Sequence, residues 1–334
     1  MLTVAGHQAT FCDGVARRSF VRAGFLGLTG FSLADILRLQ SAHAGHSSAD
    51  SNAVIFVELA GGPSQFETYD PKPHAPVEYR GEFGAVSTSV PGVLFSELMA
   101  EQAKVMDRLS IIRSVRHNSN AHDPSSHLSQ TGYYKRGQKG GQSAADTMPC
   151  FGSVIARLRG SNVSGLPAYV AVPRVMRNGR PSYLGAAYSP FETVHDPGQP
   201  DFRVENLSPA SGLNSVRLGD RRGLLTTLDR QRRLHDLQGA SSAVDEFRDQ
   251  SFELVTGSRA RAAFDITAES DATRDSYGRN TTGQSLLLAR RLVEAGVTCV
   301  TVRVTGWDDH TRLAPRIKQR GPAYDRGMAA LVRD

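Results

Sequence analysis

The sequence contains little cysteine. Its 334 residues include three cysteines, and neither Cys150 nor Cys299 shows metal-ligand spacing. A cysteine-based zinc site and a disulfide framework are therefore not indicated, although a disulfide is permitted outside the cytoplasm. Cys299 lies in the apolar run VTCVTVRV, where we expect a buried, inert thiol.

Blocks of like charge, Gly-X-Y triplets and long heptad runs are also missing. Their absence excludes a disordered, collagen-like or coiled-coil protein. Hydrophobic residues make up 40% of the chain, which is enough for a sizeable core. The formal net charge is +6, from 39 Lys and Arg against 33 Asp and Glu, but no basic run is interleaved with aromatic residues. We therefore expect an anionic small molecule or glycan as substrate, and no nucleic acid.

The N-terminal region has the order of parts of an export signal. Paired Arg17 and Arg18 precede an apolar stretch over residues 23–39, and a small-x-small cleavage pattern follows at residues 42–44. This order resembles a twin-arginine signal, which would make the twin-arginine export machinery a partner. The alternative is an ordinary amphipathic first helix. Asp35 and several glycines interrupt the apolar stretch, so we expect no permanent membrane span.

The export signal sets the expected domain organisation. Residues 1–44 are predicted to be a signal peptide and residues 45–52 a linker of Gly, Ser and Asp, which leaves residues 53–334 as the folded domain. The mature protein is expected in the periplasm, at the cell surface or secreted. Loss of the signal removes four Arg and two Asp, which lowers the formal net charge from +6 to +4.

Apolar periodicity predicts an α/β protein. Continuous apolar runs predict strands at 53–60, 109–115, 166–172 and 297–304. Helical spacing predicts helices at 95–108, 147–159, 218–237 and 283–295, with one or two more inside 243–264. Because strands alternate with helices, we expect a mostly parallel central sheet with helices on both faces. Gly296 is expected to end the helix before it, and residues 173–216 are a Pro/Gly-rich excursion.

In parallel sheets, functional groups gather beyond the C-terminal ends of the strands. The segment after the first strand, ELAGGPSQFETYD, is the first candidate. Gly61 and Gly62 allow the backbone to approach a ligand closely. Glu58, Glu67 and Asp70 offer the oxygen ligands that hold Mg²⁺, Ca²⁺ or Zn²⁺. A glycine turn with solvated carboxylates is the alternative.

The second candidate follows the strand predicted at 109–115. Three histidines are spaced by five residues here: His117, His122 and His127. With Asp123 among them, they form the usual ligand set of a transition metal. Ser125 and Ser126 stand where a helix is expected to begin. One of them is either the N-cap of that helix or a nucleophile that profits from the helix N-terminus.

The third candidate, GWDDH, directly follows the last predicted strand. Asp308 and His310 are two residues apart, so both can reach one metal ion from a loop. Trp307 is the single tryptophan of the chain, and we expect it to pack under the loop.

Taken together, these segments resemble a family of exported bacterial proteins known as domain of unknown function 1501, within the alkaline phosphatase-like superfamily. Besides the twin-arginine start, the motifs are GGPSQFETYDPKP (61–73), YRGEFGAVSTSVPGV (79–93), RSVRH (113–117), HDPSSHLSQTGYY (122–134), YGRNTTGQSLLLARRLVEAGV (277–297) and GWDDH (306–310). They cover nearly the whole mature chain in the family's order.

The resemblance implies an alkaline phosphatase-like fold with a metal site at the C-terminal edge of the sheet. There, Asp and His residues hold one or two divalent ions (Zn, Mg or Ca), and a Ser, Thr or formylglycine attacks a phosphate or sulfate ester. Asp308 and His310 match the superfamily's Asp/His motif at a shorter spacing. Glu58 lies nearest to the Asp that usually ends the first strand, and Glu67 or Asp70 can substitute for it. The predicted metal ligands are therefore Asp308, His310, His117, His122, Glu58 and Asp70.

The sulfatase signature runs Cys-x-Pro-Ser-Arg and then, after four residues, Thr-Gly. Residues 122–132 have the same spacing. His122 replaces the Cys that becomes formylglycine, and Ser126 replaces the Arg that supports it, so a formylglycine sulfatase is not expected. The resemblance implies Ser125 as the catalytic nucleophile, and His122 as a metal ligand or phosphate contact.

The end of the chain departs from the family pattern. Residues 320–334 begin an amphipathic helix, and the GEFGRTP-like and GRDHW-like motifs that follow in the family do not occur. The resemblance thus predicts an incomplete domain whose C-terminal part is missing, and an inactive fragment is one hypothesis. The other two are a metal-dependent hydrolase of phosphate or sulfate esters, and a non-catalytic envelope protein that binds sulfated or other anionic glycans.

Overall fold

A computed structural model describes residues 52–119, 121–135, 148–204 and 257–334, together with Leu207, Asp220 and Gly223. The predicted signal peptide lies outside the described residues, as do nearly all of the predicted linker and nearly all of the helix predicted at 218–237. Among the described residues, no helix combines the length and the apolar character needed to cross a bilayer.

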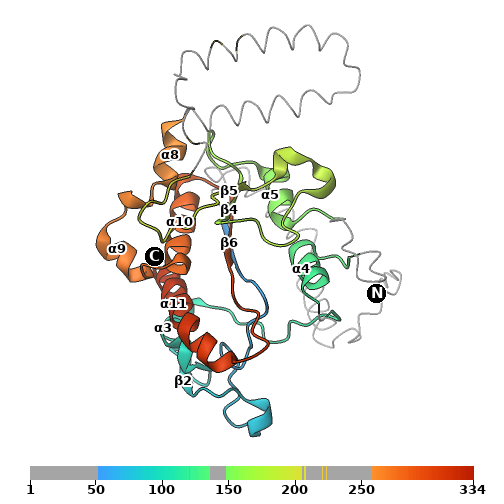
Figure 1. Cartoon of the computed structure of the whole chain (residues 1–334), viewed down its shortest axis with the longest axis vertical. Coiled ribbons are helices and arrows are strands. Elements are labelled where there is room, and N and C mark those ends of the chain that lie inside the picture. The colour runs from blue at the N-terminus through green and yellow to red at the C-terminus, as the bar shows by residue number, and fades with distance from the viewer. Residues whose placement is uncertain are drawn as a thin grey trace, which may run out of the picture. The chain divides into compact units, whose positions relative to one another are not determined.

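In the described part of the chain, the strands of the central sheet (Figure 1) pair in parallel, as predicted. Its strands are β1 (Val54–Leu59), β4 (Tyr169–Val172), β5 (Phe191–Glu192) and β6 (Cys299–Val304), in the order β1-β6-β4-β5. In the register of the sheet, Glu58 is level with Arg303, and Val172 is level with Val302. The strands predicted at 53–60, 166–172 and 297–304 are therefore confirmed, and their carboxyl ends share one edge.

Side chains on β6 alternate between two apolar layers. Val300, Val302 and Val304 belong to the main core, whereas Cys299 packs in a second cluster with Cys150. Both thiols are fully buried and free, and burial raises the pKa of Cys299 to about 12. The expectation of a buried, inert Cys299 is confirmed.

The main core lies between the sheet and a layer of helices, with α10 (Thr281–Ala295) against β6 and β1. The remaining helices of this layer are α11 (Leu313–Arg333), α9 (Asp271–Tyr277), α8 (Ser258–Phe264) and the 3-10 helix η6 (Ile266–Ala268). Asn280 caps α10 by accepting a hydrogen bond from the Gly283 backbone N–H. Gly296 ends α10 in the left-handed conformation, as predicted.

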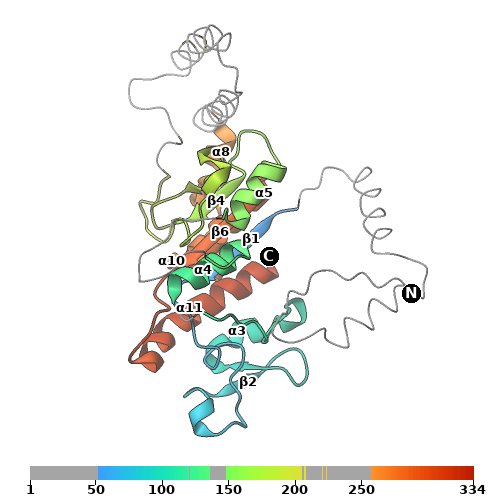
Figure 2. The same cartoon turned by 90° about the vertical axis from the view of Figure 1, so that its right-hand side faces the viewer.

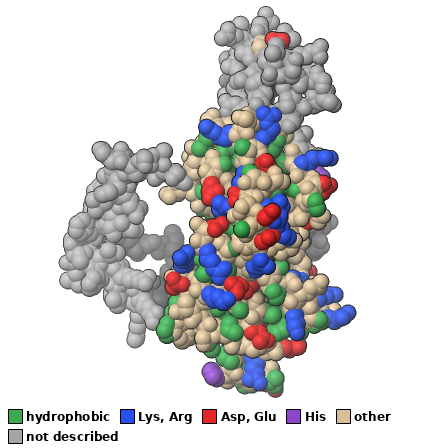
Figure 3. All heavy atoms as spheres, turned by 90° about the vertical axis from the view of Figure 1, so that its left-hand side faces the viewer, with side chains coloured by type: hydrophobic (Ala, Val, Ile, Leu, Met, Phe, Trp, Pro, Cys, Tyr) green, Lys and Arg blue, Asp and Glu red, His purple; other side chains and the backbone are tan. Residues whose placement is uncertain are grey.

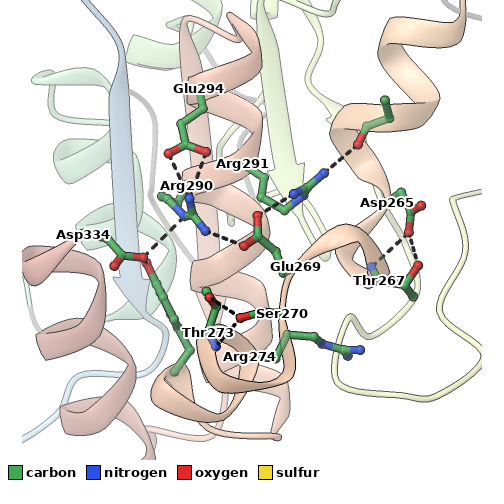
Figure 4. A network of polar contacts seen from close by, with 12 residues as sticks. Asp265, Thr267, Glu269, Ser270, Thr273, Arg274, Arg290, Arg291, Glu294 and Asp334 are labelled. Atoms are coloured by element: carbon green, nitrogen blue, oxygen red, sulfur yellow. Dashed lines mark hydrogen bonds and ion pairs between the residues drawn. The ribbon is translucent and has the colours of Figure 1, made fainter.

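Charges of both signs are interspersed on the outer face of this layer (Figure 3). One network in it ties α10 to η6 and to the end of α11 (Figure 4). Glu269 lies between Arg290 and Arg291, and Arg290 also pairs with Glu294 at 2.9 Å and with Asp334 at 3.5 Å. These ion pairs link helices that already pack against each other. Because the network contains both positive and negative side chains, it does not form a patch of one charge.

Helices α5 (Phe151–Arg159) and α4 (His122–Thr131) lie on the other side of the sheet (Figures 1 and 2). Phe151 of α5 contacts Phe56 of β1, with ring centroids 4.9 Å apart. Helices on both faces of the sheet are thus confirmed. The helix predicted from residue 147 begins at Phe151, and the helix predicted inside 243–264 includes α8 among its described residues.

Two predicted elements differ from the structure. The single helix predicted at 95–108 is broken into short pieces. These are the end of β3 (Leu94–Ser96), the 3-10 helices η2 (Glu97–Met99) and η3 (Met106–Arg108), and α3 (Ala100–Ala103). Strand β3 pairs antiparallel with β2 (Ala85–Ser87). The prediction of a strand at 109–115 is wrong, because this segment forms no strand and no strand among the described residues pairs with it. Ile112 and Val115 are exposed, and Arg113 instead donates to the carbonyl oxygen of Tyr69.

The Pro/Gly-rich segment after β4 also differs from the expectation. Residues 173–204 contain the 3-10 helices η4 (Ser182–Leu184) and η5 (Ala186–Tyr188), but the segment then returns to the sheet as β5, beside β4. A further 3-10 helix, η1 (Val77–Tyr79), lies between β1 and β2.

Candidate functional site

Three predicted site residues meet near the carboxyl edge of the sheet. His122 begins α4, whereas Asp308 and His310 follow β6. His122 Nε2 lies 3.2 Å from Asp308 Oδ2, and His310 Nε2 lies 2.8 Å from Asp308 Oδ1. One ligand atom from each residue lies within 4.8 Å of the others. The structure therefore brings together segments that are far apart in the sequence, which we call the His/Asp group.

The loop that carries Asp308 and His310 is held by its other side chains. Trp307 is buried and meets the ring of Tyr324 edge-on, with centroids 5.7 Å apart. The prediction that Trp307 packs under the loop is thus confirmed. Asp309, next in the chain, forms an ion pair with Arg320 of α11 at 2.7 Å.

Gly61 fixes the distance between this loop and the end of β1. The backbone N–H of Trp307 donates to the carbonyl oxygen of Ala60 at 3.1 Å. A Cβ on Gly61 would lie 2.4 Å from the backbone nitrogen of Asp308, and φ of Gly61 is +128°. Gly61 therefore permits a close approach to the GWDDH loop, whereas the sequence had suggested an approach to a ligand.

We expect Gly61→Ala to displace Asp308 and to weaken metal binding at the His/Asp group about tenfold or more. The matched control is Gly62→Ala. Gly62 also has a positive φ, at +111°, but a Cβ there meets no atom within 4 Å. Both variants carry the strain of a left-handed alanine, so the difference between their zinc affinities isolates the collision with the loop. Equal affinities for the two variants would contradict this explanation.

The donor chemistry of the His/Asp group fits a transition metal. Two imidazole nitrogens and one carboxylate are common zinc ligands, whereas Mg²⁺ and Ca²⁺ prefer oxygen ligands alone. Two ligands at about 2.1 Å from a tetrahedral ion lie about 3.4 Å apart, and one ligand atom from each of the three residues lies within 4.8 Å of the others. The side chains of His122, Asp308 and His310 are 46%, 49% and 81% exposed, so one side of the group faces solvent.

The other predicted metal ligands have separate surroundings. Asp70 forms an ion pair with Lys72 at 2.9 Å. His117 Nδ1 accepts a hydrogen bond from the Ser119 backbone N–H at 3.2 Å. Among the described residues, neither of them nor Glu58 belongs to a ligand group of three or more.

Glu58 instead faces Arg303 across the β1–β6 pair, at 3.7 Å. Burial raises the pKa of the Glu58 carboxyl, and the positive charges of Arg303 and Arg177 oppose that rise. Among the described residues, its buried Oε2 has no hydrogen-bond partner. Glu67 is also buried, and its Oε2 accepts no hydrogen bond from the described part of the chain.

The serines on α4 are not helix caps. The N-cap position is Ala121, without a side-chain hydrogen bond, so Ser125 and Ser126 lie inside the helix and the N-cap alternative is wrong. The Ser125 hydroxyl donates to the Ser119 carbonyl oxygen at 3.3 Å. Ser125 follows His122 by three residues, which places the two on one face of α4. His127 is fully buried, and its Nδ1 lies 2.9 Å from the Tyr133 carbonyl oxygen.

Asp309 and Arg320 were not predicted from the sequence. Asp309 lies within the GWDDH motif, but only its neighbours Asp308 and His310 were predicted to be metal ligands. The sequence shows several basic residues on the helix that follows the motif, but it does not indicate which of them pairs with Asp309.

Comparisons with known proteins agree with the resemblance at the level of the family. No curated protein and no solved structure matches the sequence. The sequence does match the family described as protein of unknown function DUF1501, over residues 51–334. This range holds the whole sheet, α4 and the GWDDH loop. The chain therefore belongs to the DUF1501 family.

Proposed function

We propose that this chain is an exported, metal-dependent hydrolase of phosphate or sulfate esters with an alkaline phosphatase-like fold. The observation that carries the proposal is the convergence of His122, Asp308 and His310 near the carboxyl edge of a parallel sheet. Ligands in such sheets bind at that edge. The twin-arginine pattern around Arg17 and Arg18 supports export to the periplasm or cell surface.

Zn²⁺ is the ion that the donor set favours over Mg²⁺ and Ca²⁺. When bound, such an ion polarises an ester oxygen and lowers the pKa of a nearby water. Asp308 supplies the negative charge of the group, and each of its two oxygens faces one imidazole. The exposed side of the group leaves room for an anionic ester to approach. Ser125 stays the proposed nucleophile, with its hydroxyl oriented by the Ser119 carbonyl oxygen.

Metal analysis and ester hydrolysis test the proposal together. The purified full chain is expected to retain about one Zn²⁺ per chain, and to hydrolyse p-nitrophenyl phosphate or p-nitrophenyl sulfate in a chelator-sensitive reaction. Ser125→Ala should lower the hydrolysis rate and leave zinc retention unchanged. Absence of both zinc and hydrolysis would refute the proposal. Salt-sensitive retention on a sulfated glycan that survives chelation would instead support the glycan-binding alternative.

A further inference from the structure

The residues of the GWDDH loop alternate in their environment. Trp307 and the side chain of Asp309 are buried, at 2% and 5% exposure, whereas Asp308 and His310 are exposed and meet His122. Successive residues of a loop share one backbone. The contacts that hold Trp307 and Asp309 therefore also position the backbone from which Asp308 and His310 project.

Arg320 of α11 contacts both buried residues. Its Nη2 donates to both carboxylate oxygens of Asp309, at 2.8 and 2.7 Å. Its guanidinium carbon lies 5.5 Å from the centroid of the Trp307 ring. Its Nε donates to the Arg316 carbonyl oxygen one turn earlier, at 3.2 Å. The guanidinium is thus held by α11 and by two residues of the loop.

We infer that Arg320 is a positioning residue for the metal centre proposed above, with Asp309 as its partner. The inference rests on the proposed function. Arg320 contacts neither the metal ligands nor the reacting ester in this assignment. It holds the loop so that Asp308 and His310 face His122, in the way that partners of metal ligands elsewhere orient those ligands. A lysine keeps the charge but lacks the planar guanidinium that stacks on Trp307.

Arg316 offers a matched control. It lies one turn before Arg320 on the same helix and also reaches Asp309, but through one contact at 3.4 Å. Its side chain is 49% exposed, against 22% for Arg320. Removing Arg316 changes the net charge by the same amount as removing Arg320 and leaves the contact with Trp307 intact.

The experiment compares Arg320→Ala, Arg320→Lys and Arg316→Ala in the full chain. Zinc affinity is measured by competition with a chelator, and metal geometry by the visible absorption of bound Co²⁺. Trp307 fluorescence reports on the loop, because Trp307 is the single tryptophan. We expect Arg320→Ala to lower zinc affinity about 10- to 100-fold, to change the Co²⁺ spectrum and to shift the fluorescence to the red. Arg320→Lys should recover part of the affinity, and Arg316→Ala should resemble wild type.

A double-mutant cycle with Asp309→Asn tests the pairing of the two residues. If Arg320 acts through Asp309, the double variant binds zinc about as well as the weaker-binding single variant, whereas additive losses would overturn the pairing.

Unchanged zinc affinity, Co²⁺ spectrum and fluorescence in Arg320→Ala would overturn the inference and leave the proposed function standing. If wild type binds no zinc, the proposed function and the metal role of Arg320 both fail, whereas fluorescence and amide hydrogen exchange over residues 306–310 still show whether Arg320 holds the loop. If Arg320→Ala does not fold, Arg320→Lys and Asp309→Asn provide the same comparison.

Discussion

Replacement of Asp308 by alanine should lower zinc affinity about a hundredfold or more. Each oxygen of Asp308 lies next to one imidazole of the His/Asp group, so its loss removes the central ligand of the proposed metal site. Loss of a residue that only orients a metal ligand costs about 10- to 100-fold, and loss of a ligand costs at least as much. Chelator competition at neutral pH measures the affinity of the wild-type chain and of the variant.

Asp70→Ala is the matched control for Asp308→Ala. Asp70 was also a predicted ligand, but the structure places it beside Lys72, outside the His/Asp group. Its loss should leave zinc affinity unchanged. The thermal midpoint should stay close to wild type for Asp308→Ala, because the side chain is half exposed and lies at the surface. Tight zinc binding by Asp308→Ala, or equal losses in both variants, would contradict the assignment.

Among the variants proposed for this protein, Asp325→Ala should cause the largest loss in the free energy of unfolding. Asp325 lies on α11, is 4% exposed, and accepts hydrogen bonds from the backbone N–H groups of Glu101 and Gln102, at 2.7 and 2.8 Å. The carboxylate thus satisfies the first turn of α3 from another helix. Each buried donor left without a partner costs about 1–3 kcal/mol, so we expect the free energy of unfolding to fall by about 2–6 kcal/mol.

The surroundings of Asp325 make this loss hard to relieve. The hydroxyl of Tyr69 donates to Gln102 Oε1 at 2.8 Å and lies 2.7 Å from the Tyr324 hydroxyl, so the polar atoms here form a connected network. Chemical denaturation of both proteins measures the change. Asp325→Asn keeps one acceptor oxygen and should lose less stability than Asp325→Ala. Equal stability of wild type and Asp325→Ala would show that water replaces the carboxylate.

The stability difference between wild type and Asp325→Asn should depend on pH in a defined direction. Burial raises the pKa of Asp325, and the hydrogen bonds from Glu101 and Gln102 oppose that rise. Between the ordinary value, about 3.9, and the raised value, the folded state binds more protons than the unfolded state. The wild-type free energy of unfolding therefore falls as pH rises through this window. Because Asp325→Asn lacks this term, its deficit relative to wild type should be largest near pH 4 and should shrink toward pH 7. A deficit that grows with pH would contradict this.

The sequence alone predicted the elements whose causes are local. The apolar runs at 53–60, 166–172 and 297–304 form strands because continuous burial suits the interior of a parallel sheet. The helix at 283–295 was recognisable from its spacing and from Gly296, which ends it. The run at 109–115 contains branched aliphatic residues, as the true strands do. It is not a strand because a strand also needs a neighbour to pair with, and composition does not report the neighbour.

The α/β fold class, the strands at 53–60, 166–172 and 297–304, the helix at 283–295 and the residue types of the candidate site were thus determined by the sequence itself. The spacing of apolar residues and the position of a helix-ending glycine determine structure over a few residues, so both can be recognised from the sequence. Only the tertiary structure decided that His122 meets Asp308 and His310 while Asp70 and His117 stay apart. It also placed Arg320 of α11 against Asp309 and Trp307 of the GWDDH loop. These contacts join distant segments, and their distances depend on how helices and sheet pack, which no local pattern specifies.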